Sequence, residues 1–307
     1  MPALPVTYVD RYSRTVKTER IYGERWLRWA YENPVGRLAV WLLFRRAFAS
    51  RWYGRKMKKR SSGWRVVPFV GKYEIEWCEF EKSPFDYKSF NEFFCRALKA
   101  DARPIAPGDR LATLPADGRH LAIPRIDAAD GFYVKGEAFQ LAALLGEDRL
   151  PEEERRHTRM FAGGSLLISR LCPTDYHRFH FPVDGLPGEP REIGGWLYSV
   201  NPVALRRNID YLVRNKRFLT LIDSPVFGPV AMIEIGATNV GTVIQSFIPG
   251  KPAAKGVEKG LFSYGGSCVV TVFAPGRIVF DRDLTEASAR HLEVYARMGD
   301  RLGEARG

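Results

Sequence analysis

The sequence predicts an α+β protein, with a helical N-terminal region over residues 1–100 and a β-rich core over residues 101–307. Two observations support this prediction. Apolar and aromatic residues recur at helical spacing between residues 15 and 60, whereas short β-branched runs alternate with Gly and Pro after about residue 111. The chain of 307 residues is 45% hydrophobic and 27% charged, which is ordinary for a globular protein with a buried core.

The N-terminal region is expected to form helices between residues 15 and 60. The segment ERIYGERWLRWAYENP places Trp26, Leu27 and Trp29 near one face and ends before Pro34. The next segment, GRLAVWLLFRRAFASRWYGRK, sets Trp41 and Trp52 among arginines. This composition is typical of a helix that lies in a membrane interface, but a helical hairpin packed on the protein's own core would look the same. No apolar run approaches the length of about 20 residues that spans a bilayer.

The core is expected to be an antiparallel or mixed sheet built from short strands. A capped helix should begin after Ser89, with Glu92 three residues later, and precede this sheet. Helical insertions are predicted at Phe139–Leu144 and Glu152–Arg159, and a last helix at Leu284–Arg301. The strand-like runs are SLLISRL, RFLTLI, PVAMIEIGA, GTVIQSF, SCVVTVF and RIVF.

Charge and cysteine content limit the class of partner. The net charge of +12 suits nucleic acid, an anionic membrane or an acidic substrate, and no RRM, KH or C₂H₂ signature supports nucleic acid. The four cysteines form no C-x-x-C pair, so neither a zinc cluster nor a disulfide framework is expected. Met1–Arg20 lacks the apolar stretch of a secretory signal. The basic run without an acid comprises Arg45, Arg46, Arg51, Arg55, Lys56, Lys58, Lys59 and Arg60.

Three polar clusters could carry chemistry. Asp117 lies in PADG, where an Asp before Gly is also a common turn residue. His177 and His180 lie three residues apart in RLCPTDYHRFHFPVDG. A metal site would need further ligands, so acid–base work is the better interpretation, although two structural histidines would give the same pattern. In the third cluster, KGVEKGLFSYGGSCVVTVF, two glycines precede Ser267.

The glycine pair before Ser267 has two interpretations. It can be a hairpin turn, or it can allow a strained Gly266–Ser267 bond whose carbonyl the Ser267 hydroxyl reaches. The sequence has no G-x-S-x-G elbow, no phosphate-binding P-loop and no G-x-G-x-x-G after a strand. A hydrolase-type serine and a nucleotide site are therefore not supported.

Taken together and in this order, these segments resemble the phosphatidylserine decarboxylase family. The resemblance covers about residues 20–280, and DYHRxHxPxxG is its most specific part. The matching segments are YGERWLRWAYENPVGRL, KSFNEFFCRALKADARPI, PADG, CPTDYHRFHFPVDG, YSVNP, IEIGATNVGTV and KGVEKGLFSYGGS. The family's cleavage motif commonly reads L-G-S-T or G-G-S-T, and here Cys268 replaces the threonine, either as a mild substitute or as a small buried hydrophobe.

The resemblance implies a pyruvoyl enzyme that cleaves itself between Gly266 and Ser267 into a β chain, 1–266, and an α chain, 267–307. His180 would be the base for attack by the Ser267 hydroxyl, and Asp117 would hold His180. The pyruvoyl group left at residue 267 would form a Schiff base with phosphatidylserine, whose decarboxylation yields phosphatidylethanolamine. His177 would position the substrate carboxylate or supply a proton. No metal or soluble cofactor is implied.

The resemblance also implies partners and a location. The substrate lies in an anionic membrane, so the N-terminal helices would dock the enzyme peripherally on the cytoplasmic membrane. The two chains would form a heterodimer that dimerises further, with no role for nucleic acid. One alternative is a pyruvoyl-dependent decarboxylase of a soluble amino acid, for which the basic N-terminus would have no purpose. Another is a basic RNA-binding protein, which would remain one uncleaved chain.

Overall fold

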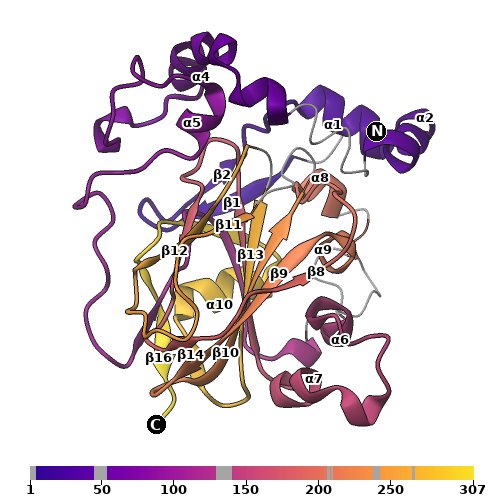
Figure 1. Ribbon diagram of the computed structural model, residues 1–307, viewed down its shortest axis with the longest axis vertical. Coiled ribbons are helices and arrows are strands. Elements are labelled where there is room, and N and C mark those ends of the chain that lie inside the picture. Colours follow the sequence, from indigo (N-terminus) through magenta and orange to yellow (C-terminus); the bar gives the residue numbers. More distant parts are fainter. Residues whose placement is uncertain are drawn as a thin grey trace.

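A mixed ten-stranded sheet runs through the middle of the molecule (Figure 1). The computed structural model describes residues 5–44, 54–128, 140–205, 208, 210–237, 243–264 and 267–307. The strand order is β2-β1-β15-β4-β5-β13-β10-β9-β7, with β8 also paired to β9, and all pairs are antiparallel except β1–β15. The strands are β1 (Thr7–Asp10), β2 (Thr15–Thr18), β4 (Gly118–Ile123), β5 (Ser165–Leu171), β7 (Leu186–Pro187), β8 (Arg191–Ile193), β9 (Arg217–Ser224), β10 (Gly228–Gly236), β13 (Ser267–Phe273) and β15 (Glu293–Ala296).

Two three-stranded sheets and one helix cover one face of the main sheet. An apolar cluster joins Leu167 and Val269 of the main sheet to Phe179, Phe262 and Phe280 of the small sheets. One small sheet is β11 (Val243–Gln245), β12 (Glu258–Phe262) and β6 (Arg178–His180), and the other is β14 (Ile278–Phe280), β16 (Arg301–Ala305) and β3 (Leu111–Thr113). The helix is α10 (Arg282–Ala289), whose Leu284 and Ala287 belong to the same cluster.

Short helices cover the opposite face. Cys268, Val270 and Val272 of β13 point to this side and pack in a second apolar cluster. Burial on both faces explains why SCVVTVF is apolar without alternation. The covering elements are α6 (Leu141–Leu145), α7 (Arg156–Phe161), α8 (Pro202–Leu205), α9 (Tyr211–Arg214) and the 3-10 turn η4 (Ile126–Ala128). A further 3-10 turn, η5 (Glu152–Glu154), lies between α6 and α7 in the chain and has no buried residue.

The N-terminal helices lie together at one end of the molecule, at the top of Figure 1. As predicted, α1 (Glu24–Glu32) ends before Pro34, and Ser89 Oγ caps α5 (Phe90–Phe94) by accepting from the Glu92 N–H at 3.1 Å. Residues 54–58 are helical, whereas Arg45, Arg46, Arg51 and Trp52 of the predicted helix lie outside the described residues. The other elements are α2 (Pro34–Ala39), a π-helical turn η1 (Val40–Phe44), 3-10 turns η2 (Arg60–Arg65) and η3 (Trp77–Glu79), and α4 (Val66–Tyr73).

Two sequence expectations are corrected by the structure. Residues 15–18, expected to be helical, form β2, which with β1 extends the main sheet. The helix expected at Leu284–Arg301 ends at Ala289, and the chain turns at His291 (φ 57°) into β15 and then β16. Val294 is buried where β15 lies between β1 and β4, so tertiary pairing overrides the local helical pattern. No helix in the described part of the chain is long and apolar enough to cross a bilayer.

Candidate active site

The ends of three neighbouring inner strands, β4, β5 and β13, bring predicted site residues together at one end of the main sheet. Ser267, the first residue of β13, pairs with Leu171 at the end of β5, and Asp117 directly precedes β4, the next strand over. Neighbouring strands lie about 4.8 Å apart, so the backbones of Asp117 and Ser267 are separated by about 10 Å. The loop that follows Leu171 carries His177. Backbone pairing alone therefore gathers residues that are up to 150 positions apart, 117 to 267, in the sequence.

Ser267 is fully buried, and its Oγ has no hydrogen-bond partner among the described residues. A buried hydroxyl without a partner loses its hydration without compensation, which is unusual in a folded protein. Gly265 and Gly266, on the other side of the predicted cleavage, lie outside the described residues. The neighbouring Cys268 points to the opposite face of the sheet, where burial raises the pKa of its thiol. Cys268 thus packs as a small hydrophobe.

His177 is buried with one ring nitrogen held and the other bare. Its Nδ1 donates to the Asp175 carbonyl at 2.9 Å, and Nε2 has no partner among the described residues. Because a carbonyl only accepts, Nδ1 carries the proton and Nε2 presents a lone pair. Phe94 at the end of α5 covers the ring, with centroids 3.7 Å apart. Burial, with a smaller effect from the charge of Arg96, lowers the pKa of His177 to about 3, so the ring is neutral.

His180 has the same tautomer but a different environment. Its Nδ1 donates to the Gly256 carbonyl at 2.9 Å, and its Nε2 lies 3.3 Å from the Tyr176 hydroxyl. The backbone N–H of His180 donates to the Pro115 carbonyl at 2.8 Å, which sets β6 beside the PADG turn. Burial lowers the pKa of His180, while the bond to Gly256 and the charges of Glu258 and Asp117 oppose that shift.

Asp117 is bound by an arginine rather than by His180. Arg103 Nη2 donates to Oδ2 at 2.6 Å, Arg103 Nε contacts both carboxylate oxygens, and the Met298 N–H donates to Oδ1 at 2.9 Å. No hydrogen bond joins Asp117 to His180 in the described part of the chain, which differs from the expected contact. A guanidinium offers paired donors that match a carboxylate, so it occupies the oxygens that His180 would need. Asp117 acts on His180 through its charge.

Comparison with known proteins shows the family of this chain. The family model described as phosphatidylserine decarboxylase matches residues 90–304. A phosphatidylserine decarboxylase proenzyme of Chlamydia trachomatis serovar L2 is 42% identical over 304 residues, 99% of each chain. That of Chlamydia muridarum is 44% identical over 97% of this chain and 96% of its own, and that of Fusobacterium nucleatum is 39% identical over 97% of each. The chain belongs to the phosphatidylserine decarboxylase family. The family assignment made from the sequence is thus confirmed.

Within this phosphatidylserine decarboxylase fold, an ionic cluster missed by sequence reasoning fixes the His177 loop. Asp175 Oδ2 accepts from Arg119 Nη1 at 2.5 Å and from the Cys172 N–H at 2.6 Å. Arg170, on the strand beside Arg119, is buried between Glu19 and Glu293 with contacts of 2.6 Å to each. Glu293 lies on the predicted α chain and Arg170 on the predicted β chain. The sequence does not predict this cluster, because its acidic and basic residues lie far apart in the chain and form no motif.

A second buried charge pair lies near Ser267. Lys259 Nζ contacts Glu234 Oε1 at 2.9 Å with both side chains fully buried, and Gln245 bonds to each of them. Glu234 lies opposite Val269, and Gly236 opposite Ser267, so Glu234 is on the same sheet face as Ser267 and one pleat away. Lys259 and Gln245 approach from β12 and β11. The pair thus ties together strands that flank the predicted cleavage segment.

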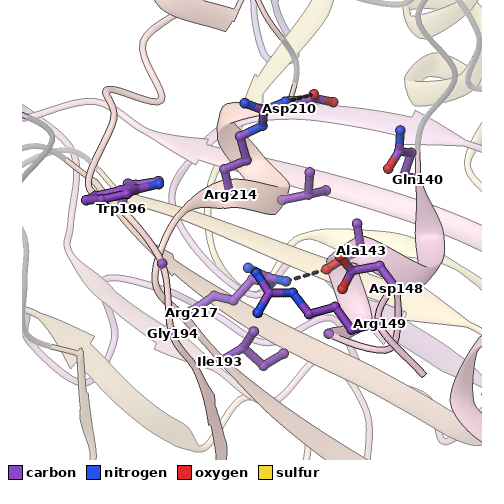
Figure 2. A pocket seen from close by; sticks show the side chains of 13 residues that line it. Gln140, Ala143, Asp148, Arg149, Ile193, Gly194, Trp196, Asp210, Arg214 and Arg217 are labelled. Carbon is purple, nitrogen blue, oxygen red and sulfur yellow. Dashed lines mark hydrogen bonds and ion pairs between the residues drawn. The ribbon is translucent and has the colours of Figure 1, made fainter. Parts of the chain in front are cut away.

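One pocket of the described part of the chain is separate from these residues. It has a volume of 680 Å³ and lies between α6, β8 and α9 (Figure 2). Arg214 pairs with Asp210 there, and Arg217 donates to the carbonyls of Ala143 and Leu144. None of the predicted site residues lines it. In the described part of the chain, no group of three or more His, Cys, Asp and Glu residues could hold a metal ion.

Proposed function

We propose that this chain decarboxylates phosphatidylserine to phosphatidylethanolamine with a pyruvoyl group that it makes from Ser267. The observation that carries the proposal is the buried Oγ of Ser267, which has no partner among the described residues and follows a glycine pair, at the end of the sheet shared with Asp117 and His177. This environment fits a group made in place from the side chain, because it already excludes water and leaves the oxygen uncommitted. Once formed, the pyruvoyl group supplies a carbonyl that accepts the electrons left by loss of CO₂.

Self-cleavage begins with attack of Ser267 Oγ on the Gly266 carbonyl carbon. A C–O bond forms and the C–N bond breaks, which leaves an ester and a free amine. Loss of the Ser267 Cα proton then expels the Gly266 carboxylate, and hydrolysis of the resulting enamine consumes water and releases ammonia. The first step needs a base, and we assign it to His180. Its Nε2 carries the lone pair of the neutral ring and contacts the Tyr176 hydroxyl at 3.3 Å, a long bond that Ser267 would replace, and the charge of Asp117 stabilises the imidazolium.

His177 is assigned to turnover. Because its Nδ1–H is held by the Asp175 carbonyl, its bare Nε2 accepts a proton rather than donating one to a carboxylate. The substrate ammonium must lose a proton before its amine reacts, and the substrate Cα must gain one after CO₂ leaves. A neutral histidine can take the first proton and return it in the second step. Of the two roles expected from the sequence, this geometry favours proton transfer over binding of the carboxylate.

Docking on the membrane is assigned to the N-terminal helices. Trp26, Trp29 and Trp41 are 39%, 42% and 53% exposed, and Trp64 is 71% exposed. Exposed Arg55, Lys56, Lys58, Lys59 and Arg60 lie between Trp41 and Trp64 in the chain. The Tyr22 hydroxyl before α1 lies 3.5 Å from that of Tyr264, three residues before Ser267, so these helices adjoin the reaction site. We propose peripheral binding to the cytoplasmic membrane and, for the processed α and β chains, a further homodimer.

One experiment tests the reaction. Intact-mass spectrometry should find chains 1–266 and 267–307, the second with pyruvoyl at its N-terminus, and vesicles of phosphatidylserine should yield phosphatidylethanolamine. Ser267→Ala should remain one inactive chain, whereas Ser263→Ala, a change at a neighbouring buried serine, should still cleave. His177→Ala should cleave yet lose turnover. Activity on free serine but not on phosphatidylserine would overturn the lipid assignment, and cleavage of Ser267→Ala would overturn the whole scheme.

A further inference from the structure

The backbone carbonyl oxygen of Asp175 accepts hydrogen bonds from both His177 and the buried Arg96. The Asp175 carbonyl accepts from His177 Nδ1 at 2.9 Å and from Arg96 Nη2 at 3.0 Å. Arg96 Nη2 also donates to the Thr174 carbonyl at 2.9 Å. A carbonyl oxygen has two lone pairs, so both donors are accommodated at once. Arg96 therefore fixes the direction of the oxygen that sets the tautomer of His177.

The guanidinium of Arg96 is bound by backbone carbonyls: besides those of Thr174 and Asp175, it reaches the Phe93 carbonyl of its own segment, with Nη1 at 3.5 Å. Arg96 is 4% exposed and lies between the rings of Phe80 and Phe93, 4.8 Å from each centroid. In the described part of the chain its side chain forms no ion pair, and its Nε has no partner. Burial lowers the pKa of Arg96 to about 10, which leaves it charged at neutral pH. A buried cation without a carboxylate is costly, and here backbone carbonyls of the histidine loop solvate it.

Three successive residues, Phe94, Cys95 and Arg96, contact the chain around His177 (residues 174–178). The Phe94 ring lies against the His177 ring at an interplanar angle of 36°. The Cys95 carbonyl accepts from Arg178 Nε and Nη2 at 3.2 and 3.1 Å, and Arg96 binds the carbonyls of Thr174 and Asp175. The helix α5 thus ends in a clamp on residues 174–178. The sequence predicts a capped helix for FNEFFCR and no contact with the histidines, so the structure adds this contact.

We propose that Arg96 is a positioning residue for His177: through the Asp175 carbonyl it holds the imidazole with Nδ1 protonated, so that Nε2, which has no partner among the described residues, keeps its lone pair for the substrate. This inference rests on the proposed role of His177 in turnover. The positive charge of Arg96 also keeps Nε2 unprotonated, because a cation near the imidazole disfavours a second proton on the ring. Arg96 is the charged group that acts on His177 among the described residues, since the Asp175 carboxylate turns away to Arg119 and the Cys172 N–H.

The fold offers a matched control arginine. Arg217 is also buried, at 3% exposure, and its pKa is also lowered by burial to about 10. Among the described residues, its side chain also donates only to backbone carbonyls, those of Ala143, Leu144 and Asn215. It lies in the separate pocket of Figure 2, away from His177. Arg217→Gln should therefore reproduce the structural loss of Arg96→Gln without its effect on the histidine.

The test uses the processed enzyme and two readouts. Arg96→Gln should lower kcat by about 100-fold or more, within the usual contribution of a positioned acid–base group, and move the acidic limb of the kcat profile to higher pH. Arg96→Lys keeps the positive charge, so its acidic limb should stay at the wild-type pH. This variant replaces Arg96→Gln in the test if the Gln variant does not fold. Arg217→Gln should keep the wild-type profile. A wild-type profile in Arg96→Gln would overturn the proposal.

The second readout does not depend on activity. In ¹⁵N-histidine-labelled protein, assigned with His177→Gln, the wild-type His177 should keep an unprotonated Nε2 down to about pH 5, well below the usual histidine pKa. In Arg96→Gln this nitrogen should titrate at higher pH or exchange tautomers. An unchanged His177 signal in that variant would sink the positioning role. A changed signal together with full activity of His177→Ala would instead refute the role of His177 in turnover.

Discussion

Arg103 binds Asp117 through two nitrogens at once, with Nη2 2.6 Å from Oδ2 and Nε 2.9 Å from Oδ1. Arg103 also contacts Glu79 Oε2 at 2.8 Å, so one guanidinium balances two carboxylates. The Asp117 carboxylate is therefore fixed in place within the PADG turn, where its negative charge acts on His180. This arrangement makes Arg103 part of the apparatus that we assign to self-cleavage.

We expect Arg103→Met to accumulate uncleaved chain, because Asp117 would lose the partner that holds it. Asp117→Ala and His180→Ala should do the same, whereas His177→Ala should cleave. A denaturing gel at successive times after synthesis measures the fraction cleaved. Arg297→Met is the matched control, since Arg297 contacts Glu79 at 3.1 Å but makes no bond to Asp117. Wild-type cleavage in folded Arg103→Met would remove Arg103 from the mechanism.

The buried pair of Lys259 and Glu234 predicts an asymmetric response to mutation. Lys259→Met leaves a buried carboxylate without its cation and should lower the free energy of unfolding by about 3–5 kcal/mol. Replacing both residues, as Lys259→Met with Glu234→Leu, should cost far less, because no charge remains buried. Urea unfolding of the uncleaved Ser267→Ala chain measures both. Equal losses in the single and double variants would mean that packing, not charge, sets the stability here.

Buried neutral histidines predict acid sensitivity. Burial lowers the pKa of His120 and of His177 to about 3, so the unfolded chain binds a proton to each at pH values where the native chain does not. The free energy of unfolding should therefore fall as pH falls from about 6.5 toward 3, by about 1.4 kcal/mol per pH unit for each such histidine. His120→Gln in the Ser267→Ala chain should reduce that slope by one histidine's share. Denaturant unfolding between pH 5 and about 6.5 checks it, with exposed His291→Gln as the control.

Local sequence patterns predicted the strands that are buried on both faces, as β5 and β13 show. They missed β2 and β15, whose short segments become strands only through pairing with β1 and β4. The same contrast between local patterns and long-range contacts holds for the site. Asp117, His177, His180 and Ser267 stood out by motif, but the arginines that hold them did not. Arg96 binds carbonyls 78 and 79 residues away, and such a contact leaves no periodic trace in the sequence.

Membrane docking should depend on both the exposed tryptophans and the basic run beside them. Changing Lys56, Lys58, Lys59 and Arg60 to Glu should weaken binding to anionic vesicles, because each well-placed cation contributes about 1 kcal/mol near such a surface. Self-cleavage should be unchanged, since no hydrogen bond or ion pair joins these residues to Asp117, His177, His180 or Ser267 in the part of the chain that the structure describes. Raising the salt concentration should weaken wild-type binding without abolishing it, because charges are screened over about 8 Å at physiological ionic strength while burial of Trp29 and Trp64 persists.

Co-sedimentation with vesicles of increasing phosphatidylserine content measures this docking, alongside a gel for the α chain. The control reverses four exposed basic residues elsewhere, Lys251, Arg282, Arg290 and Arg306, which changes net charge equally. If docking follows position, only the first set should lose affinity. If both sets lose it equally, the total charge of +12 drives binding and the N-terminal helices have no special role. If neither set loses it, the apolar surface suffices, and Trp29→Ser with Trp64→Ser should then release the protein from the membrane.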